Sequence, residues 1–265
     1  MADMTNEFAD KVVVVSGASR GIGFGIGQAF ARQGAHVVLA ASSAENLARA
    51  ADQMEADGQP RPLTVAGDLR TLDGCQRVYD VVAEKFDRCD VLANSAGATK
   101  AGAFVSQTDD DWQDGFALKF HGCVRLCRLF WPYLSESNGV VVNIIGGAAR
   151  TPDPEFLVGG SVNAAVANFT KGLAGLGKRD GVRVNAILPG LTETERVQSL
   201  FEQRAEATGS TPEQVRQSAI ENEGLWRLGT PNDNAELALF LASSRAGHIQ
   251  GAAIAVDGGA TPGVY

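Results

Sequence analysis

Residues 12–23 read VVVVSGASRGIG, and this stretch decides the fold. A β-branched run ends in a loop that carries three glycines, Gly17, Gly21 and Gly23. Gly17 permits a tight turn, Gly21 lets the backbone approach a pyrophosphate, and Gly23 lets a helix begin close to the strand. The N-terminal dipole of that helix would face the anion. The stretch therefore predicts the first strand, phosphate loop and first helix of a dinucleotide-binding unit.

Six further β-branched or apolar runs follow along the chain, separated by longer helical patterns. They lie at 36–40, 62–67, 90–94, 139–145, 182–188 and 252–258. Continuous apolar strands that alternate with helices are typical of a parallel sheet covered on both faces. At 265 residues and 45% hydrophobic composition, the chain can bury one large core. We expect a single α/β domain over residues 1–265, a Rossmann-type doubly wound parallel sheet.

The charge balance and the cysteines exclude several kinds of partner. A net charge of -8 disfavours nucleic acid and anionic membranes, and no apolar run approaches the roughly 20 residues of a membrane span. A small-molecule substrate is expected instead. The N-terminus has no signal-peptide pattern, which indicates a cytoplasmic protein. Cys123 and Cys127 could present two metal ligands on one helical face, but buried small side chains are the favoured interpretation. No metal is predicted.

One segment, at about 195–228, interrupts the alternation of strands and helices. It contains two helical pieces, RVQSLFEQRAEATG and TPEQVRQSAI, and Thr211 followed by Pro212 is a typical start for the second. Because α/β folds bind ligands beyond strand ends, the insertion predicts a substrate lid. A purely structural excursion is the alternative.

The end of the second strand indicates which dinucleotide fits. An acid there would accept hydrogen bonds from a free ribose 2′-hydroxyl and repel a 2′-phosphate, but the chain has Ala41, Ser42 and Ser43. Arg20, in the glycine loop, can offer a guanidinium to that phosphate. Glu45 lies further on and is interpreted as a solvated helix residue. NADP(H) is therefore favoured over NAD(H).

Several motifs, in their order along the chain, resemble those of the short-chain dehydrogenase/reductase family: SGASRGIG at 16–23, Asp68-Leu69, NSAG at 94–97, RVNAILPG at 183–190 and VDGG at 256–259. The resemblance covers nearly the whole chain and implies hydride transfer with NAD(P). Together with the glycine loop and the strand end, it gives the expected cofactor-binding residues. They are Gly17, Ser19, Arg20, Gly21, Ile22, Gly23, Ser42, Asp68, Leu69, Asn94, Ala96, Gly97, Pro189, Gly190, Thr192 and Thr194.

The same resemblance implies a catalytic set of asparagine, serine, tyrosine and lysine, and this chain departs from it at every position. The stretch NAAVANFTKGLA at 163–174 resembles the family helix that begins at the lysine, which puts Asn163 at the lysine position and Gly159 at the tyrosine position. Gly146 stands where the serine is usual, and Lys119 stands where the asparagine is usual. Two hydroxyl residues have become glycine, and lysine and asparagine are exchanged.

The exchange suggests a rearranged site. Lys119 could return the missing cation and act as the proton donor if burial lowers its pKa. Asn163 would then bind ribose or the Lys119 ammonium through its carbonyl oxygen. The alternative is that Lys119 faces solvent or an interface. Glycine at 146 and 159 is expected to enlarge the pocket.

No tyrosine replaces the missing phenol in this alignment. The three in the chain, Tyr79, Tyr133 and Tyr265, all fall outside the aligned position.

Three functions remain open. The first is an atypical NADP(H)-dependent oxidoreductase that acts on a carbonyl/alcohol pair or an activated double bond. The second is a cofactor-binding sensor without turnover, and the third is a non-redox lyase or isomerase on the same fold. The resemblance also implies a homodimer or homotetramer formed through the helices near 112–134 and 160–178. Gly122, Gly172 and Gly175 on these helices are compatible with close packing.

Overall fold

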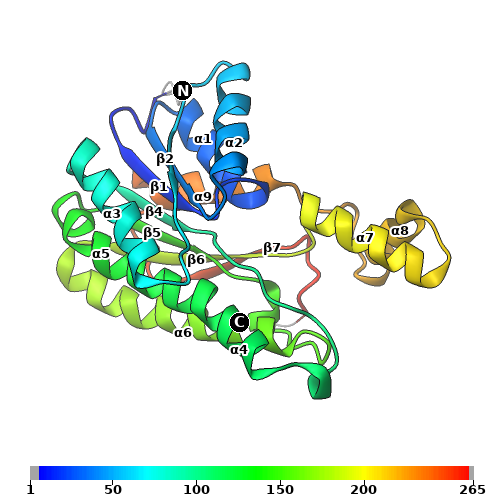
Figure 1. The fold of residues 1–265 in the computed structure, drawn as a ribbon. Helices are drawn as coiled ribbons and strands as arrows, with labels where there is room; N and C mark the ends of the chain where they lie inside the picture. The colour runs from blue at the N-terminus through cyan, green and yellow to red at the C-terminus, as the bar shows by residue number, and fades with distance from the viewer. Residues whose placement is uncertain (1–5, 263–265) are drawn as a thin grey trace.

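A computed structural model describes residues 6–262 and contains one parallel sheet of seven strands (Figure 1). The strand order is β3-β2-β1-β4-β5-β6-β7, and every neighbouring pair is parallel. The strands are β1 (Val12–Ser16), β2 (His36–Ala41), β3 (Leu63–Ala66), β4 (Val91–Asn94), β5 (Val140–Ile144), β6 (Arg183–Pro189) and β7 (Ala253–Val256). The predicted doubly wound α/β fold is confirmed, with each apolar run forming a strand.

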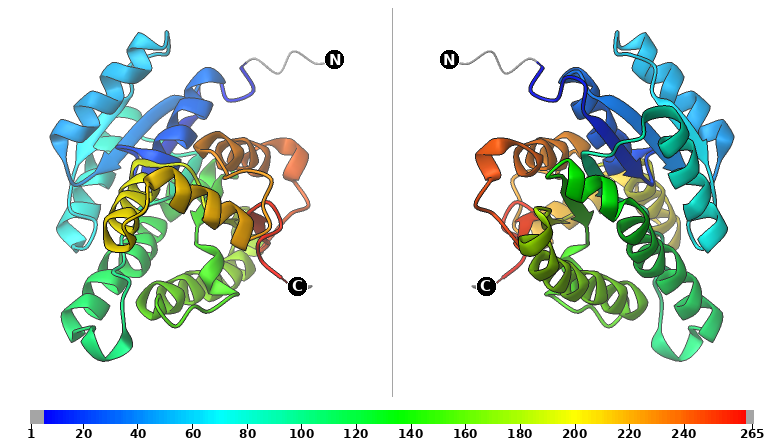
Figure 2. Two further views of the ribbon diagram at one scale, coloured as in Figure 1. Left: turned by 90° about the vertical axis from the view of Figure 1, so that its right-hand side faces the viewer. Right: turned by 90° about the vertical axis from the view of Figure 1, so that its left-hand side faces the viewer.

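Helices cover both faces of the sheet (Figures 1 and 2). One face carries α1 (Gly21–Arg32), α2 (Ala44–Ala56) and α9 (Pro231–Ala242), and the other carries α3 (Leu72–Phe86), α5 (Gly122–Glu136) and α6 (Leu157–Asp180). Within β1, Val13 and Val15 pack into the first layer while Val12 and Val14 pack into the second. Because strand side chains alternate between faces, a strand buried on both faces needs an unbroken valine run.

The segment predicted as a substrate lid forms two helices, α7 (Glu195–Thr208) and α8 (Pro212–Asn222), which extend from the body of the domain (Figure 1). Thr211 caps α8 by accepting a hydrogen bond from the Gln214 amide, with Pro212 in the first turn, as the sequence predicts. A small core of Phe201, Ile220, Leu225 and Leu228 joins the two helices. The two helices therefore have their own packing beside the main core.

The helix before β5 changes its winding midway. α4 (Asp109–Gly115) leads into a π-helical turn, η2 (Phe116–His121), which continues directly as α5. Turns of this kind occur mostly as single bulges in α-helices, frequently at functional sites. Three short 3-10 turns, η1 (Phe104–Ser106), η3 (Gly147–Ala149) and η4 (Ser244–Ala246), complete the described elements.

The chain changes direction across the sheet between β1 and β4. β1 pairs with β2 on one side and with β4 on the other, so the loops after β1 and β4 diverge at the carboxyl edge of the sheet. In open α/β sheets, ligands bind in the crevice at such a switch point. None of the helices formed by residues 6–262 has the length and apolar character needed to cross a bilayer.

Candidate functional site

A pocket of about 590 Å³ opens at this switch point. One end is formed by the glycine loop, the end of β2 and the loop after β3, with Gly17, Ser19, Arg20, Ser42, Asp68 and Leu69 among its residues. The other end is formed by the loops after β4, β5 and β6, with Ala96, Gly97, Lys119, Gly146, Pro189 and Thr194 among its residues. Gly21, Ile22 and Gly23 line the pocket between these ends.

The glycine loop is shaped by close backbone contacts. Gly17 has a φ of +66°, and a Cβ there would lie 2.6 Å from the Cα of Ala96. At Gly23, a Cβ would lie 2.5 Å from the carbonyl oxygen of Gly17. Only glycine fits at either place, so the loop after β1 can fold tightly against the turn after β4. Ser16 supports the same turn because its Oγ accepts hydrogen bonds from the amides of Ser95 (3.2 Å) and Ala96 (3.3 Å).

Four of the expected cofactor or catalytic residues lie outside the lining of this pocket. They are Asn94, Asn163, Gly190 and Thr192. Asn94 is buried and donates to Asn143 Oδ1 at 2.9 Å, which ties β4 to β5. The Thr192 hydroxyl donates to the Gly190 carbonyl at 3.0 Å. Asn94 and Thr192 are therefore engaged within the protein.

The end of the pocket next to β2 has no acidic residue at the strand end. Ser42 is exposed there, while the Ser43 hydroxyl accepts a hydrogen bond from the Asn46 amide and so caps α2. Arg20 lies 3.4 Å from Glu195 of α7, and both side chains are more than 60% exposed. An ion pair this exposed contributes little, so Arg20 is free to engage a ligand anion.

Lys119 lies in the π-helical turn and reaches the far end of the pocket. Its side chain runs along Gly97, where a Cβ would lie 2.9 Å from Lys119 Cδ. The pKa of Lys119 is lowered to about 8, chiefly by burial and next by the positive charge of Arg196, while Cys123 opposes these effects. Within residues 6–262, Lys119 has no hydrogen-bond or ion-pair partner. Lys119 therefore faces the pocket, as the sequence predicts. Its pKa of about 8 lies close to the pKa that suits a general acid at neutral pH.

Asn163 is held by the backbone of Gly146. Its Oδ1 accepts a hydrogen bond from the Gly146 amide at 3.0 Å, and a Cβ on residue 146 would lie 2.8 Å from its Nδ2. The carbonyl oxygen is thus engaged, and the expected bond from it to Lys119 is not formed. Asn163 presents its Nδ2, which has no partner within the described part of the chain, beside the position usually held by serine.

Phe156 was not foreseen from the sequence. It is the residue before α6, and its ring fills the space where a side chain at Gly159 would begin, with Cε2 only 2.6 Å from the ideal Cβ. Asn163 likewise fills the space beside Gly146. The expectation that the two glycines enlarge the pocket is therefore wrong, because neighbouring side chains occupy both vacancies.

The tyrosines lie elsewhere. Tyr79 and Tyr133 stack on each other with ring centroids 5.7 Å apart, and Tyr133 donates to Asp87 on the far side of the α3–α5 layer. Tyr265 lies outside the described residues. Within residues 6–262, no group of three or more histidine, cysteine, aspartate or glutamate side chains could hold a metal ion.

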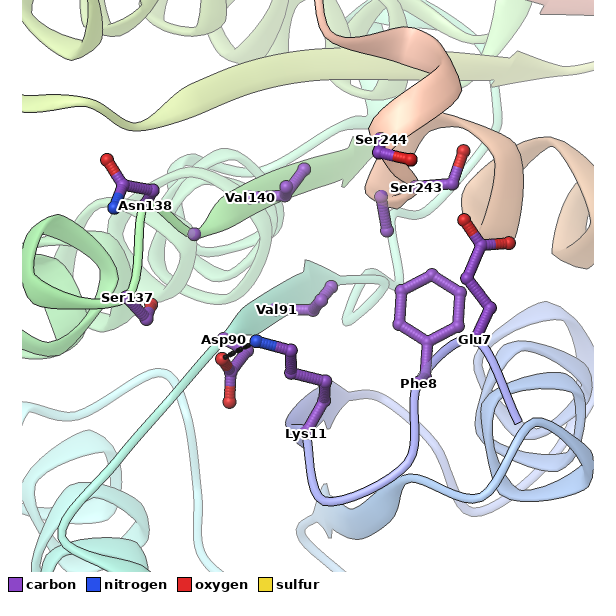
Figure 3. A pocket seen from close by; sticks show the side chains of 12 residues that line it. Glu7, Phe8, Lys11, Asp90, Val91, Ser137, Asn138, Val140, Ser243 and Ser244 are labelled. Atoms are coloured by element: carbon purple, nitrogen blue, oxygen red, sulfur yellow. Dashed lines mark hydrogen bonds and ion pairs between the residues drawn. The ribbon is translucent and has the colours of Figure 1, made fainter.

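A second pocket, of about 210 Å³, lies at the opposite edge of the sheet near the start of β4 and β5 (Figure 3). Its charged centre is Asp90, which accepts hydrogen bonds from Lys11 (3.1 Å), Arg88 (2.7 Å) and the Val12 amide (2.9 Å). Burial alone would raise the pKa of Asp90, but these bonds outweigh it and lower the pKa. A fully satisfied carboxylate ties the strand starts together and leaves little for a ligand to bind.

Comparison with known proteins connects the whole chain to oxidoreductases. A family model described as enoyl-(acyl carrier protein) reductase matches residues 17–261. The meso-2,3-butanediol dehydrogenase of Serratia marcescens is 32% identical over 254 residues, which cover 96% of each chain. A 3-oxoacyl-(acyl-carrier-protein) reductase of Thermotoga maritima is 30% identical over 251 residues, 94% of this chain and 97% of that protein. The crystal structure of L-sorbose reductase from Gluconobacter frateurii, complexed with NADPH and L-sorbose, superposes with a TM-score of 0.93 at 31% identity, over 99% of this chain and 100% of that one.

Proposed function

Because the chain belongs to the short-chain dehydrogenase/reductase family, we propose that it is an NADP(H)-dependent oxidoreductase in which Lys119 replaces the family's tyrosine as proton donor. Its relatives across the full length are dehydrogenases and reductases, so the chain is an oxidoreductase of this family. The orientation of Lys119 carries the proposal. A lysine with a lowered pKa and no protein partner lines the pocket in which the cofactor would bind.

The pocket fits a dinucleotide. A Cβ at Gly17 or Gly23 would meet backbone atoms, so only glycine allows the tight turn that brings this backbone to the pocket. The first turn of α1 has no acidic residue, and its N-cap residue Arg20 makes no side-chain cap, which leaves the helix N–H groups available to a phosphate. Asp68 and Leu69 would hold the adenine, and Gly97, Pro189 and Thr194 the nicotinamide half.

NADP(H) is favoured by the groups around Ser42. A 2′-phosphate would meet the Ser42 hydroxyl and the Arg20 guanidinium, and no carboxylate at the strand end would repel it. The relative from Gluconobacter frateurii was solved with NADPH, which agrees with this preference.

NADPH, when bound, supplies the hydride, and the protein's residues handle the proton. At neutral pH Lys119 is mostly an ammonium and donates a proton from Nζ to the oxygen that gains charge as a carbonyl is reduced. The amine that remains is reprotonated from water. Asn163 is buried behind Gly146 and would act as a positioning residue, because its Oδ1 holds the Gly146 amide at the pocket wall. The substrate is a carbonyl/alcohol pair or an activated double bond.

The test is a single turnover of NADPH-loaded protein mixed with a panel of ketones, aldehydes and enoyl thioesters. Loss of the near-ultraviolet absorbance of reduced nicotinamide reports hydride transfer. Lys119→Met should abolish it or slow it by at least about a hundredfold, the usual size of a general acid contribution. Lys178→Met, at an exposed position of α6, is the matched control and should leave it unchanged. An unaltered rate in Lys119→Met would remove Lys119 from the mechanism.

A cofactor-binding sensor is the second candidate, favoured by the Phe156 ring beside Gly159. That ring leaves no space for a hydroxyl-bearing side chain at the tyrosine position. Tight NADPH binding without hydride transfer across the whole panel would support the sensor.

We also infer a substrate lid and a homodimer or homotetramer. The lid comprises α7 and α8 and flanks the mouth of the pocket through Thr194, Glu195 and Arg196. Gly172 and Gly175 of α6 have open space beside them, which suits a helix from a second copy. Gly122 packs against the Leu69 carbonyl of its own chain, so it serves the fold and not the interface. Sedimentation of the purified protein would measure the assembly.

A further inference from the structure

The carboxylates that line the pocket already have arginine partners. Asp68 lies 3.3 Å from Arg70, which also pairs with Asp114. Glu195 lies 3.4 Å from Arg20. Neither carboxylate therefore pairs with Lys119 or Arg196.

Two cations at the other end of the pocket have no such match. Lys119 and Arg196 both line this end, and neither forms an ion pair within residues 6–262. The positive charge of Arg196 disfavours the protonated form of Lys119 and so lowers the pKa of that lysine. Lys119 is half-buried and Arg196 is exposed at the mouth, so two positive side chains line one end of the pocket, an arrangement that favours an anionic ligand.

Arg196 is positioned across the mouth of this end. It is the second residue of α7, and its Nη2 donates to the carbonyl oxygen of Thr99 at 3.0 Å. Thr99 belongs to the loop after β4, so the bond joins the lid to the opposite wall. A guanidinium carries five N–H donors, so most of its donor face stays available for a planar oxyanion.

The cofactor does not supply an anion at this position. Its phosphates would lie at the glycine loop and the N-terminus of α1, and its nicotinamide is neutral when reduced and cationic when oxidised. An anion bound at this end of the pocket would therefore belong to the substrate. Resting on the proposed function, we propose that the substrate is a small carbonyl compound that carries a carboxylate or phosphate, which Arg196 binds while Lys119 meets the reacting oxygen.

The reaction balances with these groups. The carbonyl carbon accepts the hydride, the π bond of the C=O group breaks, and the oxygen takes a proton from Lys119 Nζ. The substrate is reduced by two electrons to an alcohol, NADPH is oxidised, and the anionic group stays unchanged on Arg196.

The experiment measures binding to NADPH-loaded, full-length protein without turnover. Oxamate is compared with its neutral partner oxamide, and glycerol 3-phosphate with glycerol, by the change in dihydronicotinamide fluorescence. We expect one charged member to bind at least about tenfold more tightly than its neutral partner, the usual effect of a charge-assisted hydrogen bond. Whichever charged member binds identifies the anionic group.

Arg196→Gln should remove that tenfold advantage and leave neutral members unaffected, and Arg196→Lys should restore part of it. Arg204→Gln, at an exposed position of the same helix, is the matched control. Anion affinity should also fall as the pH rises through about 8, where Lys119 loses its charge. Equal binding of charged and neutral members, or equal loss of both in Arg196→Gln, would overturn the inference. Binding of anions only to cofactor-free protein would also overturn it, because the cations would then serve the cofactor's phosphates.

The two proposals can fail separately. Anion binding without NADPH oxidation would leave this inference standing and refute the reductase. Oxidation of NADPH by neutral and charged carbonyls at equal efficiency would support the reductase and refute the anionic substrate.

Discussion

The ring of Phe156 occupies the space in which the side chain of residue 159 would begin. Both residues lie at the start of α6, and the ring atoms stand closer to the Cβ position of Gly159 than two unbonded atoms can approach. The glycine and the phenylalanine are therefore a matched pair. A side chain at 159 and the Phe156 ring in its present position exclude each other.

This pairing predicts strong coupling between the two positions. Gly159→Ala should destabilise the protein by about 1–3 kcal/mol, the usual cost of overpacking. In the Phe156→Ala background the same change should cost less, because the new methyl group enters vacated space. Denaturant unfolding of the four proteins in the cycle measures the coupling.

Equal effects of Gly159→Ala with and without Phe156 would show that the ring does not fill this space.

The bond between Asn163 and Gly146 predicts a local effect. Asn163→Ala leaves the Gly146 amide without its 3.0 Å partner and should cost about 1–3 kcal/mol. Hydrogen exchange at Gly146 should accelerate. Asn168→Ala, at an exposed position of α6, should leave exchange at Gly146 unchanged and should not destabilise the protein, because alanine has the higher helix propensity. An unprotected Gly146 amide in the unmodified protein would contradict the observed bond.

The pKa of Lys119 predicts how stability depends on pH. Its folded pKa of about 8 lies below the value of about 10.4 expected in the unfolded chain. The unfolded chain therefore holds more protons between these values, and stability rises with pH across this window. Below pH 8 the half-buried amine is charged in both states, and its charge destabilises the folded state. Cofactor-free Lys119→Met should thus be more stable than the parent at pH 7, with the difference shrinking toward pH 10.

Urea unfolding at several pH values measures this difference, with Lys178→Met as the exposed control. A difference that stays constant from pH 7 to pH 10 would mean that Lys119 has an ordinary pKa.

Cofactor preference should depend on Ser42. Ser42→Asp places a carboxylate where the 2′-phosphate would lie and should weaken NADPH binding at least about tenfold relative to NADH, a change of 1.4 kcal/mol. Glu45→Gln should leave the ratio unchanged if that carboxylate is only solvated. Titration of each variant with both cofactors gives the ratio. An unchanged ratio in Ser42→Asp would argue against a phosphate at this strand end.

The sequence was sufficient for the sheet and for most of the pocket wall. β1 and its loop could be predicted because Val12–Val15 and the glycines each have a local physical requirement. The inward position of Lys119 followed from its alignment with a family position. The partners of these residues could not be predicted in this way. Arg196 meets Thr99 across 97 residues of chain, and Phe156 reaches Gly159 only because the loop before α6 turns its ring inward. Contacts of this kind depend on the path of the backbone, which residue types alone do not specify.

The most direct test of the central claim is the pH dependence of a single turnover. NADPH-loaded protein is mixed with a carbonyl substrate identified from the panel, and the rate of NADPH oxidation is measured from pH 6 to pH 10. If Lys119 is the proton donor, the rate falls as the pH rises through about 8, where the amine loses its proton. Lys119→Arg, which stays protonated throughout, should be slower and show no such fall. A fall near pH 8 that persists in Lys119→Arg, or a flat profile in the unmodified protein, would contradict the assignment.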